Sequence, residues 1–213
     1  MKEVILERHT SRVPRVQVSL TFLAFIMIGA NDGAIGVLIP SIRTYYGMDK
    51  AGIGLLFVAG TAGFLIATTM SGLLAEKLGH RRFLLAGVTC YLGDLSVISP
   101  APVLGLMLLG LLLIGLGAGV IDAGLNAYIA GLPNNSALLN YLHAFYGVGA
   151  LVGPFVATLV LALRFGWNIT YLAWAVVGVS LLAAFFMVFT DGTPAQHGGY
   201  ADRGNVLVGA LKL

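Results

Sequence analysis

Three aspartates and one histidine lie inside long apolar stretches of this chain, and these side chains have the clearest chemical potential. They are Asp32, Asp94, Asp122 and His143. An ionised side chain near the centre of a bilayer costs free energy, so it is expected to face a water-filled cavity or a partner. A carboxylate in such a cavity can accept hydrogen bonds from a polar solute, and it can bind and release a proton.

Asn31 and Asp32 occur together in the first apolar stretch and are followed by Gly33. Glycines on both sides of the pair would let the backbone bend around a ligand. Two positions for Asp32 fit this pattern. Its carboxylate can face a cavity and bind solute, which we expect, or it can cap the outer helix end or form a structural pair.

Asp122 and Asn126 are four residues apart, so on a helix they share one face. Nearby glycines leave space beside Asp122, and we expect it to face a cavity, although a buried hydrogen bond between helices also fits.

His143 can change charge near neutral pH and so take part in proton coupling. A neutral His143 that bonds to a neighbouring helix fits equally well. Asp94 is expected at a membrane interface.

The composition decides the class of protein. Hydrophobic residues make up 58% of the 213 residues, charged residues make up 10%, and the mean hydropathy is +0.93. Soluble domains carry about 25% charged residues. A spanning helix needs about 20 mostly apolar residues, and the apolar stretches lack the period-two alternation of a membrane barrel. We therefore predict an all-α membrane protein whose six spans cover about residues 17–39, 52–75, 82–99, 103–131, 137–163 and 168–190.

Basic residues predict the orientation, because they concentrate in cytoplasmic segments. With both termini in the cytoplasm, nine of the 12 Lys and Arg residues lie inside, and Arg43, Lys50 and Arg164 lie outside. The opposite orientation reverses this bias. We expect a multi-pass protein of the cell (inner) membrane. The net charge of +3 follows from this bias, so it does not indicate a nucleic-acid partner.

The chain divides into three parts: an N-terminal cytoplasmic arm, residues 1–16; a six-helix bundle, residues 17–190; and a cytoplasmic tail, residues 191–213. Glycine is abundant at 29 residues, and the pairs Gly115/Gly119 and Gly149/Gly153 have the spacing that lets helices pack closely in lipid. No cofactor or metal site is expected. The single cysteine, Cys90, excludes an intramolecular disulfide.

The turn between the second and third apolar stretches is short and basic. Its glycines are expected to allow close helix approach at Gly72 and a tight reversal at Gly79, while Glu76 can pair with a basic side chain. The residues that we assign to an inner gate are Gly72, Glu76, Lys77, Gly79, Arg81 and Arg82.

This turn resembles the signature of the major facilitator superfamily between its second and third helices, Gly-x-Leu-Ala-Asp-Arg-x-Gly-Arg-Arg/Lys. Gly72, Leu74, Ala75, Gly79 and Arg81 match that signature. The sequence departs from it at three positions, with glutamate for aspartate, lysine for arginine and histidine for arginine. These are Glu76, Lys77 and His80.

Three further stretches, residues 31–40, 121–130 and 139–154, are similar to the fucose permease-like sugar transporters. In that family the first and fourth helices line a central cavity, and their acidic residues serve sugar binding and proton coupling. The resemblance implies proton coupling at Asp32 and Asp122. It implies solute binding by Asn31, Asp32, Asp122, Asn126 and His143.

The family has twelve spans in two halves, and this chain matches the first half. The resemblance therefore implies the N-terminal half of a carrier for a sugar or related small solute, proton-coupled by alternating access. Its partners would be the lipid bilayer, the solute and protons, with a second six-helix half or a homodimer. A split or truncated half that does not transport is the main alternative. An intramembrane enzyme is less favoured, because the aspartates are predicted at different depths and no Gly-x-Ser-x-Gly motif occurs.

Overall fold

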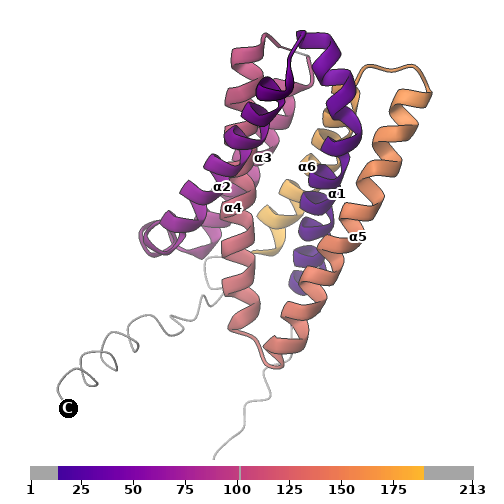
Figure 1. Ribbon diagram of the computed structural model, residues 1–213. Helices are drawn as coiled ribbons and strands as arrows, with labels where there is room; N and C mark the ends of the chain where they lie inside the picture. Colours follow the sequence, from indigo (N-terminus) through magenta and orange to yellow (C-terminus); the bar gives the residue numbers. More distant parts are fainter. Residues whose placement is uncertain (1–13, 101, 190–213) are drawn as a thin grey trace, which may run out of the picture.

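The computed structural model describes residues 14–100 and 102–189, with the side chain of Asp94 excepted, and these residues form six α-helices (Figure 1). The predicted arm therefore lies outside the described residues up to position 13, and so does the tail. The helices are α1 (Arg15–Tyr46), α2 (Lys50–Leu78), α3 (His80–Ile98), α4 (Leu104–Ala130), α5 (Asn135–Ala162) and α6 (Asn168–Val188).

Five of the six helices, α1, α2, α4, α5 and α6, are long and apolar enough to cross a membrane. The helix α3 has 19 residues, and Arg81, Arg82 and Asp94 fall among them. All six predicted helices are present. The helix α1 extends beyond the expected end of the first span, residue 39, and continues through Pro40 to Tyr46.

The connection between α2 and α3 is a single residue. Gly79 ends α2 and precedes α3 with φ 76° and ψ 154°, a backbone conformation that only glycine adopts without strain. The predicted tight reversal is therefore confirmed. At the opposite end of α2, Asp49 caps the helix by accepting a hydrogen bond from the backbone N–H of Gly52 at 2.9 Å.

Two close helix pairs form the frame of the molecule: α1 packs against α5, and α2 packs against α4 (Figure 1). A methyl group on Gly149 or Gly153 would overlap the backbone carbonyl of Ile26 or Ala30 in α1. A methyl group on Gly115 would overlap that of Gly60 in α2 in the same way. The glycine pairs thus let the backbones touch, as the sequence predicts.

The helices α3 and α6 support this frame from one side. The helix α3 packs against α4 and α6, and α6 also contacts α1. The ring of Tyr91 in α3 is fully buried, and its residue lies against the backbone of α4 at Gly117. The helices α3 and α6 thereby connect the two helix pairs, and the space between the pairs contains the candidate site.

Candidate functional site

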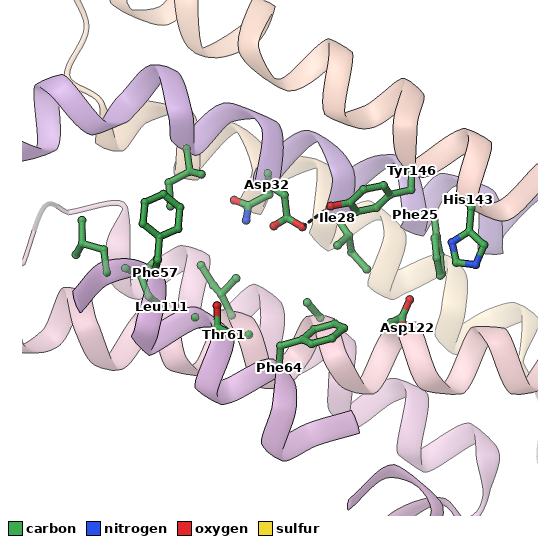
Figure 2. Close-up of a pocket in the computed structure, with 17 residues that line it drawn as sticks. Phe25, Ile28, Asp32, Phe57, Thr61, Phe64, Leu111, Asp122, His143 and Tyr146 are labelled. Atoms are coloured by element: carbon green, nitrogen blue, oxygen red, sulfur yellow. Dashed lines mark hydrogen bonds between the residues drawn. The ribbon is translucent and has the colours of Figure 1, made fainter. Parts of the chain in front are cut away.

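A cavity of about 490 Å³ lies between the α1/α5 pair and the α2/α4 pair (Figure 2). Its volume is within the range of small-molecule binding sites. All four of these helices contribute to its wall, and α3 and α6 do not. The lining residues are Phe25, Ile28, Asn31, Asp32, Ile35, Leu56, Phe57, Gly60, Thr61, Phe64, Leu111, Ile114, Gly115, Ala118, Asp122, His143 and Tyr146.

Asp32 projects from the middle of α1 into this cavity, and its side chain is exposed there. The hydroxyl of Tyr146 in α5 donates a hydrogen bond to Asp32 Oδ2 at 3.0 Å (Figure 2). Asn31, beside it, is 9% exposed and also lines the cavity. The carboxylate of Asp32 therefore accepts a hydrogen bond from α5 and keeps further acceptor capacity for a solute.

Asp122 projects into the same cavity from α4 and is half-buried. The amide of Asn126, one turn later, donates to Asp122 Oδ1 at 3.1 Å and to the backbone carbonyl of Asp122 at 2.9 Å. Asn126 itself does not belong to the lining. It therefore contacts the site through Asp122 rather than facing the cavity as a direct solute ligand would.

His143 lies on α5, one turn before Tyr146, and its side chain is exposed to the cavity. It interacts electrostatically with Asp122 across the space between α5 and α4. Its ring meets the ring of Phe25 edge to face, with centroids 6.0 Å apart. The structure thus brings Asn31, Asp32, Asp122 and His143 to one cavity.

Aromatic and hydroxyl groups of α2 also form the wall, and they are absent from the residues predicted for the site. Phe57, Thr61 and Phe64 face the cavity at intervals of four and three residues (Figure 2). Their helical spacing is a signal that was present in the sequence. It does not stand out there, because almost every neighbouring residue is apolar too.

The turn between α2 and α3 differs from the prediction at one position. Gly72 was expected to permit close helix approach, but a methyl group there would meet only open space. That expectation is wrong, because α2 is exposed along this last part and no described helix packs against Gly72. Glu76, Lys77 and Arg82 are exposed, whereas Arg81 lies over the ring of Phe186 at 5.0 Å from its centroid.

His80 begins a buried cluster at this end of the bundle. Its ring stacks on Tyr128 with centroids 5.9 Å apart, and Tyr128 packs against Phe189. The hydroxyl of Tyr128 donates to Gln17, and Gln17 donates to the backbone carbonyl of Val188 at 3.2 Å. The cluster joins α1, α3, α4 and the end of α6, and no sequence pattern indicated it.

Known proteins share both the sequence pattern and the fold. The family model of the Major Facilitator Superfamily matches residues 21–211. An uncharacterized MFS-type transporter of Yersinia pestis is 30% identical over 183 residues, which cover 84% of this chain and 47% of that protein. The 4-hydroxybenzoate transporter PcaK of Acinetobacter baylyi is 23% identical over 181 residues, which cover 78% of this chain and 37% of that protein.

A mouse protein, sodium-dependent glucose transporter 1A of Mus musculus, is 24% identical over 140 residues, covering 65% of this chain and 33% of that protein. Among solved structures, a mutant of the peptide transporter POT superimposes with a TM-score of 0.70 at 16% identity, covering 92% of this chain and 44% of that chain. The chain thus spans about half of these relatives or less.

The six-helix bundle, the family match over most of the chain and the relatives named as transporters all agree. They indicate a multi-pass membrane protein of a family that contains transporters. This chain therefore belongs to the major facilitator superfamily.

Proposed function

We propose that this chain carries a sugar or a related small solute across the membrane by proton-coupled alternating access, as the N-terminal half of a carrier. The observation that supports this proposal is that Asp32 and Asp122, from two different helices, line one cavity. Ionisable groups in that position bind solutes and relay protons in membrane carriers. In this proposal Asn31, Asp32 and Asp122 form hydrogen bonds with the solute, His143 contributes less, and Asn126 acts through its hydrogen bond to Asp122.

The lining favours an uncharged polyhydroxyl solute. Sugar hydroxyls can donate to the two carboxylates, and the apolar faces of a sugar ring can stack on Phe57 or Phe64. None of the 17 lining residues is lysine or arginine, so a monoanion would meet two carboxylates without a permanently charged cation. The relatives are named for 4-hydroxybenzoate, glucose and peptides. These three solutes differ in chemistry, whereas the lining of this cavity favours an uncharged polyhydroxyl solute.

Proton coupling would use Asp32 or Asp122. A carboxylate beside a bound solute changes its affinity for that solute when it takes up a proton, and this linkage couples a proton gradient to solute movement. We propose symport, in which the solute and the proton cross the membrane in the same direction. The short turn between α2 and α3, with Lys77, Arg81 and Arg82, would form the inner gate, with both termini in the cytoplasm and the protein in the cell (inner) membrane.

A further six-helix half, or a second copy of this chain, would complete the cavity. The helices α2 and α5 expose large apolar side chains along their length, among them Leu65, Leu151 and Phe155. Such faces suit packing against other helices as well as lipid. The same faces favour the alternative function, in which this chain assembles with a partner and does not itself transport.

Uptake into liposomes tests the proposal. The chain is reconstituted alone and with a second six-helix half expressed from a separate reading frame, and uptake of radiolabelled monosaccharides, including fucose and glucose, is measured. We expect at least one sugar to enter faster with an inward proton gradient than without it. Asp32→Asn or Asp122→Asn, whichever variant replaces the coupling carboxylate, should remove the dependence on the gradient, because an amide cannot exchange the proton.

Absence of sugar uptake in both preparations would reject the carrier proposal. Uptake that appears only with the second half would support the half-carrier. Uptake that does not respond to the proton gradient would reject coupling and leave facilitated transport.

A further inference from the structure

Tyr146 joins α5 to α1 at the cavity wall, and it has no part in the solute binding proposed above. Its hydroxyl donates to Asp32 Oδ2 at 3.0 Å, and its ring lines the cavity between Asp32 and His143 (Figure 2). The two bonded residues are 114 positions apart in the chain. The contact therefore depends entirely on how α1 and α5 are packed.

The packing of α1 on α5 anchors the backbone of Tyr146. A methyl group on Gly29 would overlap the carbonyl oxygen of Tyr146, and one on Gly33 would overlap that of Ala150 in the next turn. The two backbones are thus in direct contact around the hydrogen bond. Since close-packed backbones have little freedom to slide, the helix contact itself holds the hydroxyl of Tyr146 within bonding distance of Asp32.

Several titratable groups face this bond from the surrounding helices. Tyr91 from α3 and Tyr171 from α6 interact electrostatically with Asp32. Tyr146 interacts with both Asp32 and Asp122, and His143 interacts with Asp122. Tyr146 is the one of these residues for which the structure shows a side-chain hydrogen bond to Asp32 across a helix interface.

We propose that Tyr146 is a positioning residue of the site: it holds the ionised Asp32 carboxylate directed into the cavity and releases it when Asp32 is protonated or a solute hydroxyl replaces the tyrosine. This inference rests on the proposed function for its biological meaning. The hydrogen bond and its effect on the proton affinity of Asp32 can be tested without any solute, so the two can fail separately.

The expected effect has a definite sign. A hydrogen bond donated to a carboxylate stabilises its charged form, so removal of the donor makes protonation easier. A hydrogen bond to a charged group is stronger than one between neutral groups. One pH unit corresponds to about 1.4 kcal/mol. Tyr146→Phe should therefore move the protonation midpoint of Asp32 upward by about one pH unit.

Infrared spectroscopy of the purified full chain in liposomes measures this midpoint directly. The carbonyl band of a protonated carboxylic acid is followed over a pH titration, and the band that disappears in Asp32→Asn is assigned to Asp32. The same titration is then made on Tyr146→Phe and on Tyr141→Phe. Tyr141 is the matched control, because it lies on the same helix, is 59% exposed and does not line the cavity.

We expect the protonation midpoint of Asp32, followed by its infrared band, to be higher in Tyr146→Phe than in the parent. In Tyr141→Phe the midpoint should equal that of the parent. Equal midpoints in the parent and Tyr146→Phe would overturn the proposal, and so would equal shifts in both variants. If Tyr146→Phe does not fold, a ring-fluorinated tyrosine at position 146 keeps the shape and makes the hydroxyl a stronger donor. That substitution should lower the midpoint, and an unchanged or raised midpoint would overturn the proposal.

Discussion

Asn126 lies outside the cavity lining but is hydrogen-bonded to Asp122, which belongs to it. Its amide donates both to the carboxylate and to the backbone carbonyl of Asp122. The hydrogen-bond capacity of the amide N–H₂ group is therefore directed toward Asp122 and away from a solute. We infer that Asn126 fixes the direction of the Asp122 carboxylate, which is a different role from the solute contact that the sequence predicts.

Asn126→Ala tests this role at the scale of one residue. Loss of a hydrogen bond worth about 1 kcal/mol should weaken solute binding roughly 5-fold. The measurement is the concentration of sugar that gives half-maximal uptake, corrected for the amount of protein in the liposomes. Asn135→Ala is the control, because Asn135 forms an exposed hydrogen bond to the carbonyl of Ala130 and does not line the cavity. A larger loss in Asn135→Ala than in Asn126→Ala would contradict the assignment.

At the scale of helices, contact between backbones determines the geometry of the site. Gly149 packs its backbone against Ile26 and Ala30 of α1, and Gly29 of α1 packs against Tyr146. A side chain at either glycine position must push α1 and α5 apart. Because Asp32 and Tyr146 meet across this same interface, the hydrogen bond between them depends on glycines that do not line the cavity.

Gly149→Ala and Gly147→Ala form a matched pair of variants on one helix. A methyl group at Gly149 overlaps backbone atoms, whereas one at Gly147 meets nothing within 4 Å. Overpacking of a tight contact costs about 1–3 kcal/mol. Thermal unfolding followed by circular dichroism should therefore show a midpoint several degrees lower for Gly149→Ala and little change for Gly147→Ala. Equal unfolding midpoints for the two variants would contradict this prediction, because they would show that α1 and α5 accommodate the added methyl group without loss of stability.

Sequence patterns predicted the parts of this structure that depend on local physics. The apolar stretches predicted six helices, and the glycine pairs of α4 and α5 predicted their contacts. The reach of α1 past Pro40 was missed, because a proline that ends a helix and a proline carried inside one look alike in a sequence. Gly72 was misjudged for a related reason, since spacing alone does not tell which face of a helix meets a neighbour.

The candidate site was predictable only in part. Asp32 and Asp122 stand out because a carboxylate is unusual among apolar residues. Their meeting in one cavity, and the bond from Tyr146 to Asp32, depend on packing between helices far apart in the chain. The α2 residues of the wall, such as Phe57, could not be separated from the rest of α2, because lipid-facing and cavity-facing side chains on that helix are similarly apolar.

At the scale of the whole molecule, the six helices are buried within the bundle to different extents. The helices α1 and α4 bury about half of their most apolar stretch within the bundle, and α2 and α5 bury much less. The cavity is bounded by all four, so its outer flanks are formed by the two helices with the most uncovered apolar surface. The partner proposed above, if packed along α2 and α5, would therefore lie beside the cavity that contains Asp32 and Asp122.

Directional transport, as proposed above, requires one orientation of the bundle in the membrane, and labelling of residues on α2 can measure that orientation. Lys50 and Lys77 are exposed residues near opposite ends of this helix. At 1.5 Å per residue they are about 40 Å apart, roughly the full thickness of a bilayer with its headgroups. The excess of basic residues at the Lys77 end predicts that this end lies in the cytoplasm.

Single cysteines at these two positions, in a Cys90→Ala background, report the orientation through a membrane-impermeant maleimide. Lys50→Cys should be labelled in intact cells, and Lys77→Cys should be labelled only after the membrane is permeabilised. Vesicles turned inside out serve as the control and should show the opposite order. If Lys77→Cys alone were labelled in intact cells, the orientation would be the opposite of the predicted one. The turn between α2 and α3 could then not act as an inner gate.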